Sequence, residues 1–383
     1  MEQRRVYGKS HWYHETQSRA SRGDALPLVP EAAHVDDRFL LDLSLPDVLL
    51  NACDCWLQPA RALSDRLFPD VVQVSRLQTF SAYDRLSTAL TAAQVYGVQR
   101  LCNHYAARLA PLPGPDSSRE SNRRLAQITQ YARQLASSPS VIGSASRGQL
   151  DEVGLTTPDI ILINQIIGFV GFQARALAAF QASLGHPVRW LPGMPMQEDA
   201  PAERFASAAA VWSSDLPAVT PGYASLAQQV ALERWERQPE LAGLAPLLAT
   251  DPDALSLLGE TLAALAQPTT SHLLVALLAA RINGSQHCFL TLTERWHGAP
   301  GLPDAVRNGE RALQAWGHNH PLERAVIQAA QLLTRAPDRF SAAQLIPLQE
   351  QGFSVTDAVS LLAWCGLSGW LNRLKIGLGN DLD

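Results

Sequence analysis

Two stretches of this chain decide its fold: LDEVGLTTPDIILINQIIGFVGFQAR (150–175) and LQEQGFSVTDAVSLLAWCGLSGWLNR (348–373). In each, a short helical segment stops at a glycine, and a Ser or Thr three residues before an Asp then marks the start of a new helix. The segment that follows, 160–172 or 358–370, is apolar on nearly every side. Because a helix without a polar face has to be buried, each stretch predicts a core helix.

Small residues and an arginine recur at the same places in both predicted core helices. Gly168 and Gly366 are each followed by a second glycine three residues later, which allows a neighbouring backbone to approach closely. Each helix is expected to end at an arginine, Arg175 or Arg373, that can cap its carbonyl end. At the offset of 198 residues between these arginines, 46 consecutive positions hold 12 identities, where chance would give about three or four. We therefore expect two copies of one helical fold, packed about a pseudo-twofold axis.

Composition along the chain predicts the domain boundaries. Residues 1–37 are polar and predict a tail, or an arm that drapes over a neighbour. Residues 38–185 and 223–383 are rich in Ala and Leu at helical spacing, so each is expected to hold one helical bundle. The Pro-bearing stretch 186–222 predicts a linker with room for one short helix. Strand-like alternation is rare, and the predicted class is all-α with about a dozen helices or more.

The overall composition excludes several classes of protein. The 383 residues are 46% hydrophobic and 17% charged, enough for a packed core, and the net charge of −5 argues against nucleic acid and anionic membranes as partners. The longest plain apolar run, Leu273 to Ala280, is far below the roughly 18 residues of a membrane span. Neither a transmembrane helix nor a signal peptide is expected. Five cysteines, a small and odd number, favour a reducing cytoplasm over a disulfide framework.

The stretch from Leu348 to Ala358, with the apolar helix that ends at Trp370-Leu371-Asn372-Arg373, resembles the C-terminal helix pair of the alkylhydroperoxidase D-like family, also called the carboxymuconolactone decarboxylase family. The earlier copy is similar but has Ala174 where the Asn would be. The resemblance covers residues 38–185 and 223–379. It implies two pseudo-repeated helical bundles of that type, in a tandem member of the peroxidase-related branch.

That family carries Asn-Gly-Cys-x-x-Cys-x-x-x-His on a helix, with a Glu upstream. The matching positions of the second copy hold Asn283, Gly284, Ser285 for the first Cys, Cys288 for the second Cys, Leu292 for the His and Leu273 for the Glu. The first copy is further changed, with Val98 and Leu101 at the two Cys positions and Tyr105, preceded by His104, at the His position. Only one thiol of the motif therefore remains.

The family's chemistry is the reduction of a hydroperoxide by a thiolate, which leaves a sulfenic acid that a second thiol converts into a disulfide. A helix start lowers the pKa of the attacking thiol, and the His and Glu move the proton. With Cys288 alone, and Ser285 three residues earlier on the same expected helical face, the resemblance implies a one-cysteine oxidoreductase. Its substrate would be a hydroperoxide or another small molecule, its reductant an external thiol, and no cofactor or metal is expected.

Other interpretations stay open at this point. Cys288 could be structural, in a chain that keeps the helical fold as a binding or assembly protein with an apolar pocket and no peroxidase activity. It could pair with another thiol, such as Cys102 or Cys365. Decarboxylase or lactonase chemistry would need a proton-transfer residue, and none stands at a matching position. Because single-copy members of the family form rings of intertwined protomers, the resemblance implies a homo-oligomer. The small number of cysteines places it in the cytoplasm.

Overall fold

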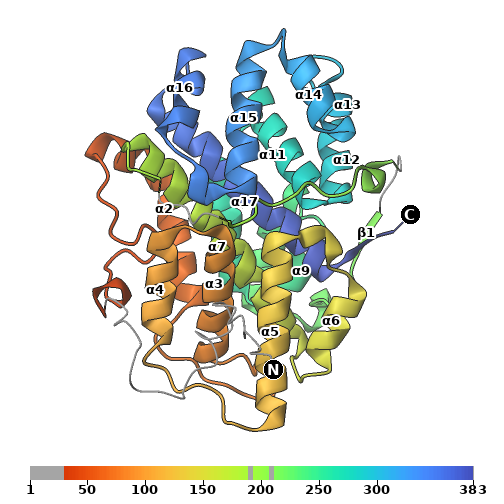
Figure 1. The fold of residues 1–383 in the computed structure, drawn as a ribbon. Helices are drawn as coiled ribbons and strands as arrows, with labels where there is room; N and C mark the ends of the chain where they lie inside the picture. Colours follow the sequence, from red (N-terminus) through yellow and green to blue (C-terminus); the bar gives the residue numbers. More distant parts are fainter. Residues whose placement is uncertain (1–29, 189–192, 207–210, 383) are drawn as a thin grey trace, which may run out of the picture.

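The protein is predominantly helical, as the computed structural model in Figure 1 shows for residues 30–188, 193–206 and 211–382, which are the residues it describes. They hold sixteen α-helices, and the strands among them are limited to one antiparallel pair, β1 (Val211–Ser213) and β2 (Asn380–Leu382). The all-α prediction is confirmed. The predicted N-terminal arm lies outside the described residues as far as residue 29, and its last part forms the short 3₁₀ helix η1 (Pro30–Ala33).

The helices follow a similar order in the two halves. The first half holds α2 (Asp47–Leu67), α3 (Ala82–Tyr96), α4 (Gln99–Leu109), α5 (Arg119–Ser137), the 3₁₀ helix η2 (Pro139–Val141), α6 (Ser144–Asp151) and α7 (Thr157–Ser183). The second half holds α8 (Leu226–Trp235), α9 (Ala245–Leu248), α10 (Pro252–Leu265), α11 (Thr270–Asn283), α12 (Gln286–Glu294), α13 (Leu302–Asn308), α14 (Glu310–Gly317), α15 (Pro321–Arg335), the 3₁₀ helix η6 (Pro337–Arg339), α16 (Ala342–Glu350) and α17 (Val355–Leu378).

The two stretches that decide the fold become α7 and α17, which share the most extensive contact between any two elements described. Figure 1 shows α17 crossing the middle of the molecule beside α7. The predicted capping boxes are present, with Thr156 and Asp159 at the start of α7 and Ser354 and Asp357 at the start of α17. The burial predicted for both helices is confirmed, since almost every residue of each is buried.

The first glycine of each pair, Gly168 or Gly366, lies where α7 and α17 meet, as its small size predicts, whereas Gly171 faces Tyr96 and Gly369 faces Asn283. A Cβ added at Gly168 would come within 1.9 Å of the Trp370 indole, and one added at Gly366 would lie 3.1 Å from the Phe172 carbonyl oxygen. Phe172 and Trp370 occupy equivalent positions, 198 residues apart. Gly168 therefore faces the indole of Trp370, and Gly366 faces the backbone of Phe172, so the equivalent glycines meet equivalent residues of the opposite helix, through a side chain in one case and the backbone in the other.

The predicted role of the two arginines is wrong in one respect. Arg175 and Arg373 do not end their helices, because α7 continues to Ser183 and α17 to Leu378. Each donates a hydrogen bond to the carbonyl four residues earlier and reaches the C-terminal turn of a helix in the opposite half. Arg175 donates to the Thr334 carbonyl of α15 (2.6 Å), and Arg373 donates to the Ala136 carbonyl of α5 (3.0 Å). They cap helix ends across the interface between the halves.

One helix in the described part of the chain, α7, is long and apolar enough to cross a membrane. Its sequence did not predict a candidate span, because only uninterrupted apolar runs were considered. Its most apolar 18-residue stretch has a mean hydropathy of 1.5, because α7 consists mainly of apolar residues and contains few polar ones such as Asn164, Gln165 and Gln173. Ninety-four per cent of this window is buried inside the structure. Such burial is typical of a core helix.

The stretch predicted as a linker, 186–222, packs closely against the helices where it is described. Where room for one short helix was expected, it contains the two 3₁₀ helices η3 (Ala202–Phe205) and η4 (Pro221–Tyr223), the second of which ends just beyond it, and the strand β1. Ala200 and Phe205 are buried. Together with α2 to α17 the linker joins one continuous hydrophobic core that runs from Phe39 to Leu378.

Candidate functional site

The motif of the second half lies at the junction of α11 and α12. Gly284 ends α11 in the left-handed conformation, with φ of 86°, which a residue with a side chain rarely adopts. Ser285 is the N-cap of α12, and Cys288 is the third residue of the helix. Gly97 ends α3 in the same way, with φ of 71°, so the junction before α4 has the same backbone geometry. The alignment of the two motifs is therefore matched by their local structure.

Cys288 lines a small cavity between α12 and α17. The cavity has a volume of about 50 Å³, which is room for a few water-sized molecules but not for a large substrate. From α17, Ser368, Asn372 and Lys375 face it together with the apolar side chains of Trp364 and Leu371. Cys288 itself is half-buried, and none of the five cysteines, all within the described residues, forms a disulfide.

Ser285 does not join Cys288 at this cavity. It is the N-cap residue that precedes the first turn of α12, and the described lining of the cavity does not include it. Its side chain is 1% exposed, and its Oγ is a buried hydroxyl for which the described residues offer no hydrogen-bond partner. A second such hydroxyl, the Oγ of Ser368, is also buried without a described partner, and Ser368 does line the cavity. The hydroxyl-bearing side chains in the described lining of the cavity are thus Ser368 and Thr291, which the sequence gave no reason to single out.

Hydrogen-bonded amide side chains, two of them buried (Asn283 and Asn372) and one partly buried (Gln197), lie behind the cavity wall. The Nδ2 of Asn283 donates to the Oδ1 of Asn372 (3.1 Å), and the Nε2 of Gln197 donates to the Oδ1 of Asn283 (2.9 Å). Arg373 donates to the Oε1 of Gln197 (3.3 Å), and burial among the helices lowers the pKa of Arg373 to about 10. Asn283 and Asn372, two residues that matched the family's pattern, therefore meet each other and fix the cavity wall.

Two cationic side chains lie at the cavity, each held by other groups. Lys375 is 3% exposed; its Nζ donates to the Ala242 carbonyl and lies 4.2 Å from the centroid of the Trp212 ring. Arg295, at the outer side, forms an ion pair with Glu240 (2.8 Å). Lys375 and Cys288 thus lie in the lining of the same cavity.

The sequence-based search missed a buried histidine, His272, on α11. Its Nδ1 lies 2.7 Å from the Thr269 Oγ1, its carbonyl accepts a hydrogen bond from the Trp364 indole, and its Nε2 is buried without a partner in the described residues. Burial lowers the pKa of His272 to about 4, so the ring is neutral at pH 7. Its position next to Leu273, which stands at the family's Glu position, was the only signal in the sequence.

The other cysteines lie apart from this cavity, since Cys288 alone among them is found in its described lining. Cys53 and Cys365 are buried, and burial raises the pKa of both thiols. Cys365 contacts the Thr334 Oγ1 (3.3 Å). Among the described residues, no three His, Cys, Asp or Glu side chains lie close enough together to hold a metal ion.

Comparison of the chain with models of known protein families and with curated proteins finds no match.

Proposed function

We propose that the chain is a tandem protein of the alkylhydroperoxidase D-like type and that it reduces hydroperoxides through Cys288. Three features support the fold part of this proposal: the similar helix order of the halves, the left-handed glycines at equivalent helix junctions, and the reciprocal contacts of α7 with α17. The offset between equivalent positions grows from 187 at Gly97 and Gly284 to 198 at Arg175 and Arg373, and the extra helices α13 and α14 lie between these points.

One observation carries the catalytic part: Cys288, in the first turn of a helix, opens into a cavity whose opposite wall presents the unpartnered Ser368 hydroxyl and the buried Lys375. In the proposed reaction the thiolate sulfur attacks the terminal oxygen of ROOH. The O–O bond breaks, the alkoxide takes a proton and leaves as ROH, and Cys288 becomes a sulfenic acid. One molecule of an external thiol then condenses with the sulfenic acid, which releases water and forms a mixed disulfide with Cys288. A second molecule of the thiol attacks the external sulfur of this mixed disulfide, which regenerates the Cys288 thiol and releases the two external thiols as a disulfide.

The size of the cavity limits what can enter it. A volume of about 50 Å³ accommodates the hydroperoxide group and its nearest carbon atoms, so the rest of the substrate would stay outside. Ser368 and Asn372 are placed to hydrogen-bond the two oxygens. An external thiol is needed because Cys288 is alone among the cysteines in the described lining of the cavity.

The test is peroxide-dependent consumption of dithiothreitol by the full chain, with cumene hydroperoxide as substrate. We expect Cys288→Ser to fall to the rate without protein, and dimedone to label Cys288 in the wild type after peroxide is added. The matched control is Cys55→Ser, because Cys55 is an exposed thiol on α2 and its loss should leave the rate unchanged. Equal rates in wild type and Cys288→Ser would overturn the proposal.

The alternative, a binding or assembly protein without peroxidase activity, is favoured by a separate observation. A larger cavity, of about 650 Å³, lies at the motif of the first half, and its described lining contains no cysteine. If this alternative holds, no variant of a cysteine will change peroxide consumption, which will equal the background rate.

A further inference from the structure

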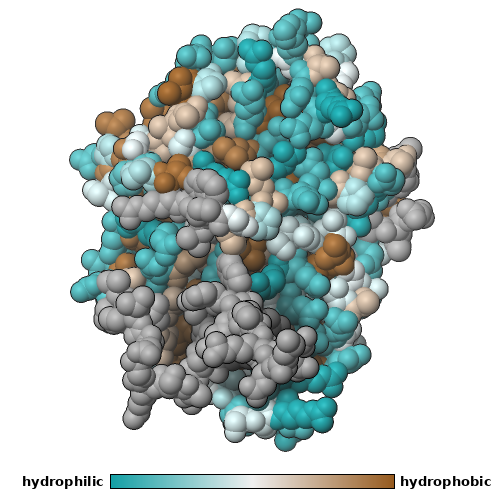
Figure 2. All heavy atoms as spheres, viewed as in Figure 1, coloured by the Kyte–Doolittle hydropathy of each residue, from teal (hydrophilic) through white to brown (hydrophobic). Residues whose placement is uncertain are grey.

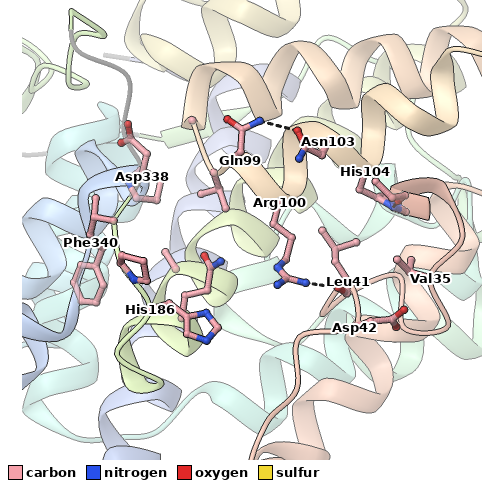
Figure 3. A pocket seen from close by; sticks show the side chains of 18 of the residues that line it. Val35, Leu41, Asp42, Gln99, Arg100, Asn103, His104, His186, Asp338 and Phe340 are labelled. Carbon is pink, nitrogen blue, oxygen red and sulfur yellow. Dashed lines mark hydrogen bonds between the residues drawn. The ribbon is translucent and has the colours of Figure 1, made fainter. Parts of the chain in front are cut away.

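The cavity at Cys288 is much narrower than the cavity of the first half. The larger one, of about 650 Å³, lies between η1, the start of α4, the C-terminal end of α7 and η6 (Figure 3). In Figure 3 it extends from Asp338 and Phe340 on one side to Val35 and Leu41 on the other. The Cys288 cavity holds only about 50 Å³, and no described residue lines both. A molecule that reaches the thiol therefore has to fit a small space, and its shape near the reacting atoms becomes decisive.

The inner wall of the Cys288 cavity is formed by side chains that have little freedom to move. Ala276 of α11 and Trp364 of α17 are 4% and 5% exposed. The indole N–H of Trp364 donates to the His272 carbonyl (2.9 Å), and the Oδ1 of Asn372 accepts from the Nδ2 of Asn283 (3.1 Å). Because protein interiors are close-packed, a ligand that is too wide cannot displace such side chains without a cost in free energy. The inner wall thus limits the width of a ligand.

An apolar side chain also lies beside the thiol on its own helix. Cys288 and Leu292 are four residues apart on α12, so their side chains are neighbours on one face of the helix. Both line the cavity, and Leu292 is partly buried against the hydrophobic core. A group attached close to the atom that the sulfur attacks therefore meets the isobutyl group of Leu292.

The outer side of the cavity lies between the end of α12 and the 3₁₀ helix η5 (Pro239–Leu241). Pro239 and Arg295 are the exposed residues of its described lining, and the ion pair of Arg295 with Glu240 (2.8 Å) joins the two elements there. On the face of the molecule that Figure 2 shows, hydrophobic residues lie in small groups between hydrophilic ones. Because a long alkyl chain would gain little on such a surface, selection has to occur close to Cys288.

One hydroxyl in the inner wall indicates a polar ligand. Ser368 is 3% exposed and lines the cavity, and its Oγ has no hydrogen-bond partner among the described residues. A buried hydroxyl in this state costs free energy, which a hydrogen bond to a ligand oxygen would offset. The two oxygens of a hydroperoxide would therefore lie toward α17, and its first carbon atom would lie toward Leu292 and the outer side.

We propose that Leu292 and Trp364 make the Cys288 site selective for hydroperoxides whose first carbon is unbranched. This selection rests on the peroxidase activity proposed above and names its substrate class, the primary alkyl hydroperoxides. The sulfur attacks the terminal oxygen, the O–O bond breaks with its electron pair on the inner oxygen, and protonation releases a primary alcohol. An external thiol then reduces the sulfenic acid on Cys288. A tertiary carbon carries two more carbon substituents, which would overlap Leu292 or the indole of Trp364.

Two isomers test the selection, n-butyl hydroperoxide and tert-butyl hydroperoxide, because they differ only in branching at the first carbon. With the full chain and dithiothreitol, we expect kcat/KM to be at least about tenfold higher for the primary isomer, after correction for the ratio that dithiothreitol alone gives. Leu292→Ala should lower this preference to about threefold or less, mainly by raising the rate with the tertiary isomer. Leu226→Ala, at a leucine of α8 that is 76% exposed, is the matched control and should keep the preference.

Equal kcat/KM for the two isomers, or an unchanged preference in Leu292→Ala, would overturn the proposal. Labelling with n-butyl and tert-butyl methanethiosulfonate, which transfer a butylthio group to a thiol, measures the selection without any peroxide. We expect the tertiary reagent to label Cys288 at least about tenfold more slowly than the primary one, relative to the exposed Cys55 in the same sample. Selective labelling without consumption of peroxide would refute the peroxidase activity and support the selection by shape, whereas equal labelling by both reagents would refute that selection.

Discussion

The two helix junctions that carry the motif, Gly97–Leu109 and Gly284–Glu294, have the same backbone turn but opposite surroundings. In the first half, Leu101 and Tyr105 stand at the positions of Cys288 and Leu292, and both are fully buried. Tyr105 donates to the Oε1 of Gln173 (2.7 Å) and packs on Phe68 (5.2 Å between ring centroids). In the second half the equivalent space is the Cys288 cavity. The same fold can therefore close a site with a tyrosine or keep it open beside a thiol.

The largest effect is expected where both halves depend on one close contact. Gly168→Ala should destabilise the protein by about 3 kcal/mol or more, because the added methyl group would overlap the Trp370 indole, which is 1% exposed and cannot move aside. Gly366→Ala, with its nearest contact at 3.1 Å, should cost less. Urea unfolding measures both.

The control for this pair is Gly148→Ala on α6, where an added Cβ meets nothing within 4 Å. That change should be neutral or stabilise by up to about 1 kcal/mol, the usual gain of alanine over glycine in a helix. A cost at Gly148 equal to that at Gly168 would show that the contact between α7 and α17 is not the cause.

A pH effect should be shared by the halves, each of which buries one neutral histidine. The pKa of His104 and of His272 falls from 6.5 to about 4 on folding, so the unfolded chain binds more protons between these values. Stability is then full above about pH 6.5 and is lost as the pH falls toward 4. We expect each histidine to account for about 2–3 kcal/mol of the loss between pH 7 and pH 4.5.

Urea unfolding of His272→Gln at the two pH values checks this effect. The variant should show a smaller loss of unfolding free energy on acidification than the wild type. His186→Gln, at an exposed histidine, should behave as the wild type. An unchanged pH slope in His272→Gln would mean that this ring is not the titrating group.

Exchanging the residues at the tyrosine position tests the comparison directly. Tyr105→Leu gives the first half the leucine that the second half has at the equivalent position, Leu292. The change removes the hydroxyl that donates to the Oε1 of Gln173 and opens a void beside Phe68. We expect a loss of about 2 kcal/mol in unfolding free energy. Tyr105→Phe, which keeps the ring and removes only the hydroxyl, should lose about 1 kcal/mol. If both variants are equally stable, the ring packing contributes nothing.

The reverse exchange should have the smallest effect on stability and a clear effect on the thiol. Leu292→Tyr places a larger side chain at the edge of the Cys288 cavity, where Leu292 is only partly buried. We expect labelling of Cys288 by iodoacetamide to slow about tenfold, because access to the sulfur controls the reaction, with less than about 1 kcal/mol change in stability. Labelling of the exposed Cys55 in the same sample is the internal reference. Faster labelling of Cys288 would show that Leu292 does not guard the cavity.

The sequence by itself determined the all-α class, the helix starts and the two buried helices, because capping residues and an apolar surface are local properties of a segment. It also singled out Cys288, through the resemblance to a family motif, and the structure places this residue in the first turn of α12. Only the tertiary structure decided that Arg175 and Arg373 cap helices of the opposite half, that Ser285 is absent from the described lining of the Cys288 cavity, and that Ser368 and Lys375 line this cavity with the thiol. These facts depend on which segments pack together across more than a hundred residues, and no pattern within one helix carries that information.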